Sequence, residues 1–215
     1  MNAANTSEAG FLVVLSDVKS ENERDYLNWL TTEHVQERLG IPGFLAVRIF
    51  RRPIDAGHRY FIWYRLDNAD VVDSAAYVER LNNPTPWSRR IMPVLGNFGR
   101  GGGHVAASTG SEAGAYIMAA GITDTPLNPS GTLAAFEAMS EIASAHLLVT
   151  DMKKSEVRTN ERDLRTNNRS FAAVLIIESD SEKALDEAAA VVLPAAPSKG
   201  DLIGGRYREI FALAK

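Results

Sequence analysis

Cysteine is absent from this chain of 215 residues. Its absence excludes disulfide bonds, iron–sulfur clusters held by thiolates, zinc sites with cysteine ligands and catalysis by a cysteine nucleophile. The 4 histidines are scattered and show neither the His-x-x-x-His nor the His-Glu-x-x-His spacing of a metal site. We therefore expect no metal and no cofactor, and any chemistry must come from the remaining side chains.

Positive charge is not in excess. Lys and Arg number 23 against 27 Asp and Glu, which gives a formal net charge of −4. A chain that holds a nucleic-acid backbone needs a basic surface field, so we expect no nucleic-acid partner. Hydrophobic residues make up 45% of the chain, which is typical of a globular protein with a substantial core.

Long hydrophobic runs are also missing. The first apolar run, at 11–15, is too short for a signal-peptide core or a membrane span, and residues 1–10 contain no basic region. We expect a cytoplasmic protein without a membrane partner.

The first half of the chain has the pattern of a βαββαβ unit. The expected elements are a strand at 11–15, a helix at 21–39, strands at 44–51 and 59–66, a helix at 70–81, and a strand that follows the glycine-rich stretch 96–103. Proline residues at 84 and 86 end the second helix. This order is that of a ferredoxin-like repeat.

The same order returns after a small-residue linker at 108–114. Its expected elements are a strand at 116–122, a helix at 131–145, strands at 146–152 and 171–179, a helix at 181–193 and a strand at 207–213. Residues 1–107 thus form a first repeat and residues 115–215 a second, degenerate one, with alanine-rich helices and no counterpart of Glu33 and His34. The candidate site therefore belongs to the first repeat.

The expected fold class is α+β. Each repeat has a four-stranded antiparallel sheet with helices on one face, and the two uncovered faces can bury each other. The two tandem ferredoxin-like repeats then pack as an α+β barrel with a pocket between or beside the sheets. A homodimer is a further expectation, because edge strands and Trp87 remain available for contact.

One stretch resembles a known superfamily. It runs from Tyr26 to Phe44, reads YLNWLTTEHVQERLGIPGF, and is followed by Ala46-Val-Arg48. It resembles the first helix and second strand of the dimeric α+β barrel superfamily, most closely the EthD-like branch, where a helical aromatic residue precedes a His and a Pro-Gly-Phe opens the second strand. The second half matches only in topology. The resemblance implies a small-molecule pocket without naming a reaction.

His34 is the first candidate catalytic residue. It falls on the apolar stripe of the helix at 21–39, and an imidazole can exchange protons near neutral pH. The resemblance implies an acid/base role at this position; the alternative is a histidine of the core or of the helix terminus. Glu33 is a second candidate, although it points about 100° away from His34 on a helix.

Arg48 is the candidate for anion recognition. Strand alternation places residues 45, 47 and 49 toward the helices and Phe44, Arg48 and Phe50 toward the space between the sheets. A guanidinium there could hold a developing oxyanion. The alternative is an ion pair with an acidic residue of the facing repeat.

Aromatic residues are the candidates for substrate binding. The strand at 59–66 carries them on both faces, so that Phe61, Trp63 or Tyr64 lines the pocket in either register, with Phe44 beside them. Simple core packing is the alternative. Trp87 is expected to act as a lid or an interface anchor.

The glycine-rich stretch that ends at His104 does not match a nucleotide-binding loop, because it precedes a strand rather than a helix. Its glycines fit a bulge or a close approach of chains, and His104 is a secondary acid/base candidate. His58 and His146 are expected at the surface or its boundary. A serine hydrolase is disfavoured because no Gly-x-Ser-x-Gly elbow is present.

These residues favour a cofactor-independent enzyme that performs acid/base chemistry on a carbonyl-bearing aromatic or cyclic substrate, as an isomerase, cyclase, dehydratase or decarboxylase does. Two alternatives stay open. One is a cofactor-independent monooxygenase that uses the electrons of its substrate, and the other is a ligand-binding barrel without catalysis.

Overall fold

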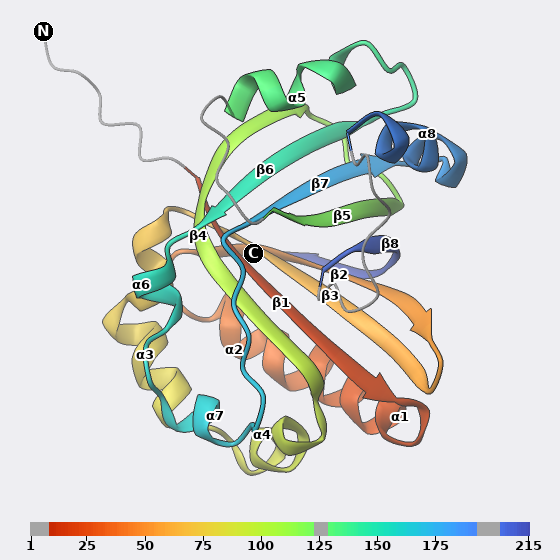
Figure 1. Cartoon of the computed structure of the whole chain (residues 1–215). Helices are drawn as coiled ribbons and strands as arrows, with labels where there is room; N and C mark the ends of the chain where they lie inside the picture. Colours follow the sequence, from red (N-terminus) through yellow and green to blue (C-terminus); the bar gives the residue numbers. More distant parts are fainter. Residues whose placement is uncertain (1–8, 123–128, 193–202) are drawn as a thin grey trace, which may run out of the picture.

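The chain folds around a closed barrel of eight antiparallel strands, in the order β1-β3-β2-β8-β5-β7-β6-β4 (Figure 1). This computed structural model describes residues 9–122, 129–192 and 203–215. The strands are β1 Gly10–Lys19, β2 Phe44–Ile54, β3 Gly57–Leu66, β4 Gly96–Gly110, β5 Tyr116–Ile122, β6 Ser144–Thr150, β7 Ala173–Ser179 and β8 Gly205–Ala214. The predicted α+β barrel is confirmed.

The barrel consists of two equivalent sheets. Each half has its four strands in the same spatial order, β4-β1-β3-β2 in the first half and β8-β5-β7-β6 in the second. The halves join where β2 pairs with β8 and where β4 pairs with β6. Because the barrel is closed, the expected free edge strands do not exist among the described strands, and a homodimer would need another surface.

Alternation along the strands separates the inside of the barrel from its outside. In β1, the side chains of Phe11, Val13 and Leu15 point inward and join residues of both halves in one apolar cluster, whereas Leu12 and Val18 join the cluster under the first-half helices. Packed side chains thus fill much of the space between the two sheets. The main candidate site lies elsewhere.

Helices cover the outer face of each sheet. Those of the first half are α1 Ser20–Trp29, the π-helix η1 Leu30–His34, α2 Val35–Leu39, the 3₁₀-helix η2 Ala69–Asp73, α3 Ala75–Asn82, α4 Pro86–Ile91 and the 3₁₀-helix η3 Met92–Val94. The expected helix at 70–81 is divided because Ser74 caps α3 with its hydroxyl, which accepts from the backbone N–H of Tyr77. No helix of the described ranges is long and apolar enough to cross a membrane.

The second half has α5 Pro129–Glu137 and α8 Glu182–Val192 on its outer face, and the short helices α6 Met152–Ser155 and α7 Asn160–Asp163 between β6 and β7. The predicted helix at 131–145 is too long, because Ser144 and Ala145 already pair with β4 and β7 as the start of β6. Figure 1 shows the connection with α6 and α7 leaving the second half and running along β4 to the helices of the first half.

Candidate functional site

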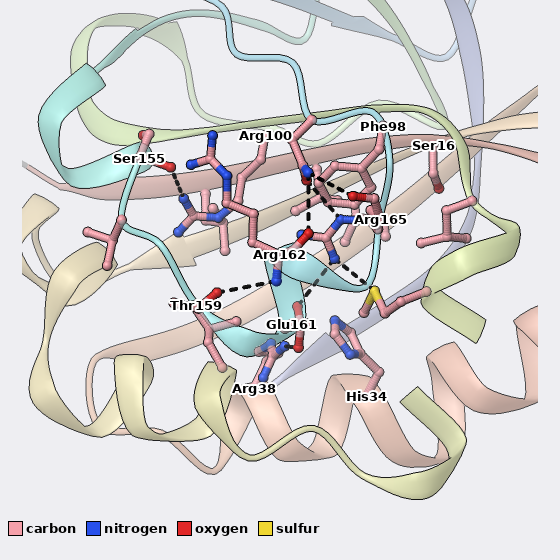
Figure 2. A pocket seen from close by; sticks show the side chains of 18 of the residues that line it. Ser16, His34, Arg38, Phe98, Arg100, Ser155, Thr159, Glu161, Arg162 and Arg165 are labelled. Carbon is pink, nitrogen blue, oxygen red and sulfur yellow. Dashed lines mark hydrogen bonds and ion pairs between the residues drawn. The ribbon is translucent and has the colours of Figure 1, made fainter. Parts of the chain in front are cut away.

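A cavity of about 120 Å³ lies on the outer face of the first-half sheet, beside the sheets rather than between them (Figure 2). Its floor is formed by the outward side chains of β1, including Leu12 and Ser16. The helix that carries His34 forms one wall, and the connection between β6 and β7 forms another. Such a space accommodates several water molecules or a ligand about the size of a single ring.

Glycine residues of β4 let this connection approach closely. A side chain at Gly101 would meet the ring of Phe171 at 2.5 Å, and one at Gly103 would meet the backbone nitrogen of Asp151 at 2.7 Å. The bare backbone of Gly102 donates to and accepts from the hydroxyl of Ser155, each at 3.0 Å. The glycine-rich stretch therefore serves close chain approach, as its sequence suggested.

His34 reaches the cavity from a π-helical turn. In η1 the backbone N–H of Val35 donates to the carbonyl oxygen of Leu30, five residues earlier. The hydroxyls of Thr31 and Thr32 donate to the carbonyl oxygens four residues earlier, at 2.8 and 2.6 Å. One extra residue in a turn changes the direction of the side chains that follow, and such turns are frequent at functional sites.

The imidazole of His34 is 8% exposed and points into the cavity (Figure 2). Its ring lies against that of Trp29, with 4.3 Å between centroids, and the Trp29 indole N–H donates to Ser88 at 3.1 Å. Among the described residues, Nδ1 of His34 has no hydrogen-bond partner. Burial, and then the charges of Arg38 and Arg165, lower the pKa of His34 well below its ordinary value. The ring is thus neutral at pH 7 and can accept a proton.

Arginine side chains give the cavity its charge. The lining includes five arginines and two glutamates, so that the positive charges exceed the negative by three. The arginines are Arg38, Arg100, Arg162, Arg165 and Arg169, and the glutamates are Glu156 and Glu161. Arg38, Arg165 and Glu161 are buried, whereas Arg169 and Glu156 are exposed. The buried groups alone carry an excess of one positive charge, which favours an anionic ligand, or a ligand that becomes anionic.

Arg38 and Glu161 join the two halves at the cavity wall. They form an ion pair of 2.6 Å with side chains 3% and 9% exposed, and Nη1 of Arg38 has no further partner among the described residues. Arg165 lies 3.8 Å from the same carboxylate and 3.9 Å from the ring centroid of Phe98. Burial lowers the pKa of Arg165 to about 10, so it remains a cation at neutral pH.

Aromatic side chains form the rest of the wall. Tyr64 is 1% exposed, and its hydroxyl has no hydrogen-bond partner within the described part of the chain. Burial raises the pKa of Tyr64, so the hydroxyl stays protonated and is available as a donor. Together with Tyr26, Trp29 and Tyr77, it gives the cavity rings that suit an aromatic ligand.

Two of the predicted site residues, His34 and Tyr64, line this cavity, and three others of the first half lie nearby without lining it. Glu33 accepts from the hydroxyl of Thr85 at 2.6 Å. The indole N–H of Trp87 donates to Asp25 at 3.0 Å and so ties α4 to α1.

Phe44 lies on the helix side of the sheet, and its predicted direction is wrong. Its ring packs against Tyr64 and Tyr77 at 5.4 and 5.2 Å between centroids. The register of β2 against β3 shifts between Phe44 and Ala46, so that regular alternation begins only after this irregularity.

The remaining predicted residues lie away from the cavity. Phe61 is fully buried in the barrel interior. Arg48 and Trp63 lie at one end of the barrel, where Arg48 binds Glu178 at 2.5 Å and also Glu209. This is the ion pair with the facing repeat that the sequence offered as the alternative for Arg48.

His104 lies in β4, opposite Gly10 of β1 and Val149 of β6, and it does not line the cavity of His34. Trp63 and Tyr64, although adjacent in β3, face opposite sides of the sheet. The predicted set is therefore divided between the two faces of one sheet.

Sequence reasoning missed Arg165 and Glu161. Both lie in the connection between β6 and β7, and nothing local to that segment indicates contact with the first half. Arg38 could have been found, because it follows His34 by one helical turn on the same stripe. Among the described residues, no group of His, Asp and Glu side chains could hold a metal ion.

Known proteins resemble this chain in structure. No family profile and no curated protein matches the sequence. An "anthrone oxidase-like protein" has a TM-score of 0.61 at 10% identity, over 100% of this chain and 95% of that one. A "Putative monooxygenase" from Fusobacterium nucleatum subsp. nucleatum has a TM-score of 0.55 at 12% identity, over 97% and 95% of the two chains. These likenesses extend over nearly the whole chain and show a shared fold.

Proposed function

We propose that this chain is a cofactor-independent monooxygenase that oxidises a small phenolic or enolisable aromatic ketone through its anion. The observation that carries the proposal is the neutral imidazole of His34, which points into a cavity with aromatic walls and a surplus of arginine. The names of the two structural neighbours support oxygen chemistry over the isomerase, cyclase, dehydratase and decarboxylase readings.

Proton removal is the first step. The neutral imidazole of His34 takes a proton from the carbon next to the substrate carbonyl, or from its phenol. The resulting oxyanion lies among Arg38, Arg165 and the hydroxyl of Tyr64, whose donors stabilise the charge. The anion also offsets the arginine charges that lower the pKa of His34, so the imidazole holds the proton better once the substrate is ionised.

Oxygen then reacts with the anion. One electron passes from the anion to O₂, and the two radicals combine to form a carbon–oxygen bond, which gives a peroxide that receives the proton from His34. Loss of water breaks the oxygen–oxygen bond and leaves a carbonyl, so that a CH₂ group and O₂ become C=O and H₂O. Four electrons leave the carbon and four reduce O₂, so no other reductant is required.

Oxygen uptake with a panel of phenols and enolisable aromatic ketones tests the proposal. We expect one O₂ consumed per product, one oxygen atom from ¹⁸O₂ in the product, and no turnover under argon. The matched variants are His34→Ala and His58→Ala, the second lying in the β2–β3 hairpin away from the cavity. Product formation at an unchanged rate under argon would establish the acid/base alternative instead. Ligand binding without turnover by any compound would establish the non-catalytic alternative.

A further inference from the structure

A second cavity, of about 330 Å³, lies at one end of the barrel. It is lined by residues of both halves, including Trp63 and Val105 of the first half and His146 and Glu178 of the second. It shares no lining residue with the cavity of His34. Volumes of this size hold small organic ligands.

Three neighbouring strands bring a serine, a histidine and a glutamate together at this cavity. Ser108 of β4 and His146 of β6 are direct cross-strand partners, and Oγ of Ser108 lies 2.9 Å from Nδ1 of His146. Nε2 of His146 lies 3.4 Å from Oε1 of Glu178, a residue of β7. Because all three residues are held by paired strands, their relative positions are fixed by the barrel itself.

The buried member of this group of three residues, Glu178, is an ionised carboxylate. Glu178 is 2% exposed, and its Oε2 accepts from Arg48 at 2.5 Å and from the backbone N–H of Gly114 at 3.1 Å. Burial alone would raise the pKa of Glu178, but the hydrogen bond with His146 and the charge of Arg48 outweigh it and lower that pKa. Oε1 is left to face the imidazole.

This carboxylate sets the roles of the two imidazole nitrogens. With Nε2–H directed at Glu178 and at the hydroxyl of Ser144, 3.2 Å away, Nδ1 carries the lone pair and accepts from the hydroxyl of Ser108. A nucleophile, a base in hydrogen-bond reach and an acidic group that orients the base are the parts of a nucleophilic serine site. Such sites are recognised by geometry and roles, and they occur without a shared sequence motif.

We propose that the barrel end is a second catalytic site, in which Ser108 accepts the acyl group of a small, neutral aryl ester. Ser108 is exposed, as an attacking group must be. The ring of Trp63, with its centroid 5.2 Å from that of His146, offers a surface for the aryl group. The charges of half-buried Arg48 and buried Glu178 neutralise each other, so this cavity does not select an anion as the first cavity does.

The reaction is a hydrolysis in two steps. Oγ of Ser108 bonds to the ester carbonyl carbon while its proton moves to Nδ1 of His146. The bond from that carbon to the aryl oxygen breaks, and the aryl alcohol leaves with the proton. Water then attacks the acyl-serine with the same base, which releases the acid and restores Ser108.

Two probes test this site: p-nitrophenyl acetate as substrate, and a fluorophosphonate as a covalent label, mapped by peptide mass spectrometry. In the intact protein we expect a burst of p-nitrophenol followed by slower turnover, and label on Ser108. Ser108→Ala should lose both the label and the burst. His146→Asn should slow acylation by about a hundredfold or more, because the general base is gone.

Thr109→Ala is the matched control. Thr109 is the next residue of β4, and its hydroxyl faces Glu137 rather than the cavity. This variant should keep label and burst. No label on Ser108 in folded protein, label on another residue only, or an unchanged burst in Ser108→Ala would each overturn the proposal, and the cluster would then be a hydrogen-bond network that closes the barrel. Folding of each variant is checked by thermal unfolding.

Discussion

The two halves of the barrel share one topology and differ in one connection. In the first half, β2 and β3 are joined by residues 55–56, whereas in the second half the equivalent strands β6 and β7 are joined by residues 151–172. The long connection crosses to the first half and brings Glu161 and Arg165 to His34. A repeated fold therefore supports one cavity of this kind, completed by the other half.

The outer faces of the two sheets also differ between the halves. Under the first-half helices, η1 and a cavity interrupt the apolar packing. On the second half, the corresponding face packs Phe136, Leu147, Leu175 and Leu185 into one cluster. Within residues 129–192 and 203–215, no π-turn and no histidine occupies that position, so the outer face of the second half retains the architecture without a counterpart of His34.

The variant His34→Ala gives the largest expected effect on the difference between the two halves. If the first half alone carries the oxidative site, oxygen uptake should fall by about 10²- to 10⁴-fold, because the proton acceptor is lost. The variant should fold, since His34 is replaced by a good helix former. A residual rate above one tenth of the wild-type rate would remove His34 from the proposed role.

A stability measurement tests the joint between the halves. Arg38→Met leaves Glu161 without its 2.6 Å partner, and we expect urea unfolding to show a loss of about 3 kcal/mol. The value lies at the lower end for buried pairs because Arg165 remains 3.8 Å from that carboxylate. The control is Lys183→Met in α8, which removes an exposed pair with Glu187 and should change stability by less than about 0.5 kcal/mol. Equal losses of stability in the two variants would contradict the distinction between the buried and the exposed ion pair.

The affinity for charged and neutral ligands tests the difference proposed between the two cavities. Arg165→Met should weaken binding of an aryl carboxylate by about tenfold to a hundredfold, since a hydrogen bond to a charged group contributes about 1.5–3 kcal/mol. Binding of the matching aryl amide should change little. Calorimetry measures both, and equal losses for the acid and the amide would indicate a collapsed cavity rather than a lost charge.

The pH dependence of stability gives the smallest expected effect. In the unfolded chain the pKa of His34 returns to about 6.5, whereas burial and the arginines keep it well below this value in the folded protein. Between these two pKa values the unfolded state binds the extra proton, so the free energy of unfolding falls as the pH falls.

His34→Asn should reduce this slope by up to about 1.4 kcal/mol per pH unit below pH 6.5. Urea unfolding at a series of pH values between 7 and 5 measures it. Parallel curves for the two proteins would show that His34 titrates normally in the folded state.

Much of the fold could be predicted from local patterns. Alternating and β-branched runs predict the strands. The prediction for β5 has the observed bounds, because this strand pairs with β7 on one side and β8 on the other, and this pairing fixes an extended backbone. The helix predicted for the alanine-rich segment 131–145 is too long. Helix propensity is a weak preference, and the pairing of β6 with β4 and β7 overrides it.

The site could be predicted only in part. The apolar stripe identified His34, because helical periodicity reports which face is packed. The π-turn could not be predicted, because helical periodicity gives no signal for one extra residue in a turn. The same limit applies to Arg165: its contact with Phe98 joins segments 67 residues apart in the chain (165 − 98), and no local rule specifies that pairing.

Covalent fusion of the two sheets has a consequence for how this protein can change. In a barrel assembled from two identical subunits, every mutation appears twice and dilution separates the parts. Here each half can mutate alone, and assembly does not depend on protein concentration. A long crossing segment could thus be acquired on one side while a tight hairpin persisted on the other.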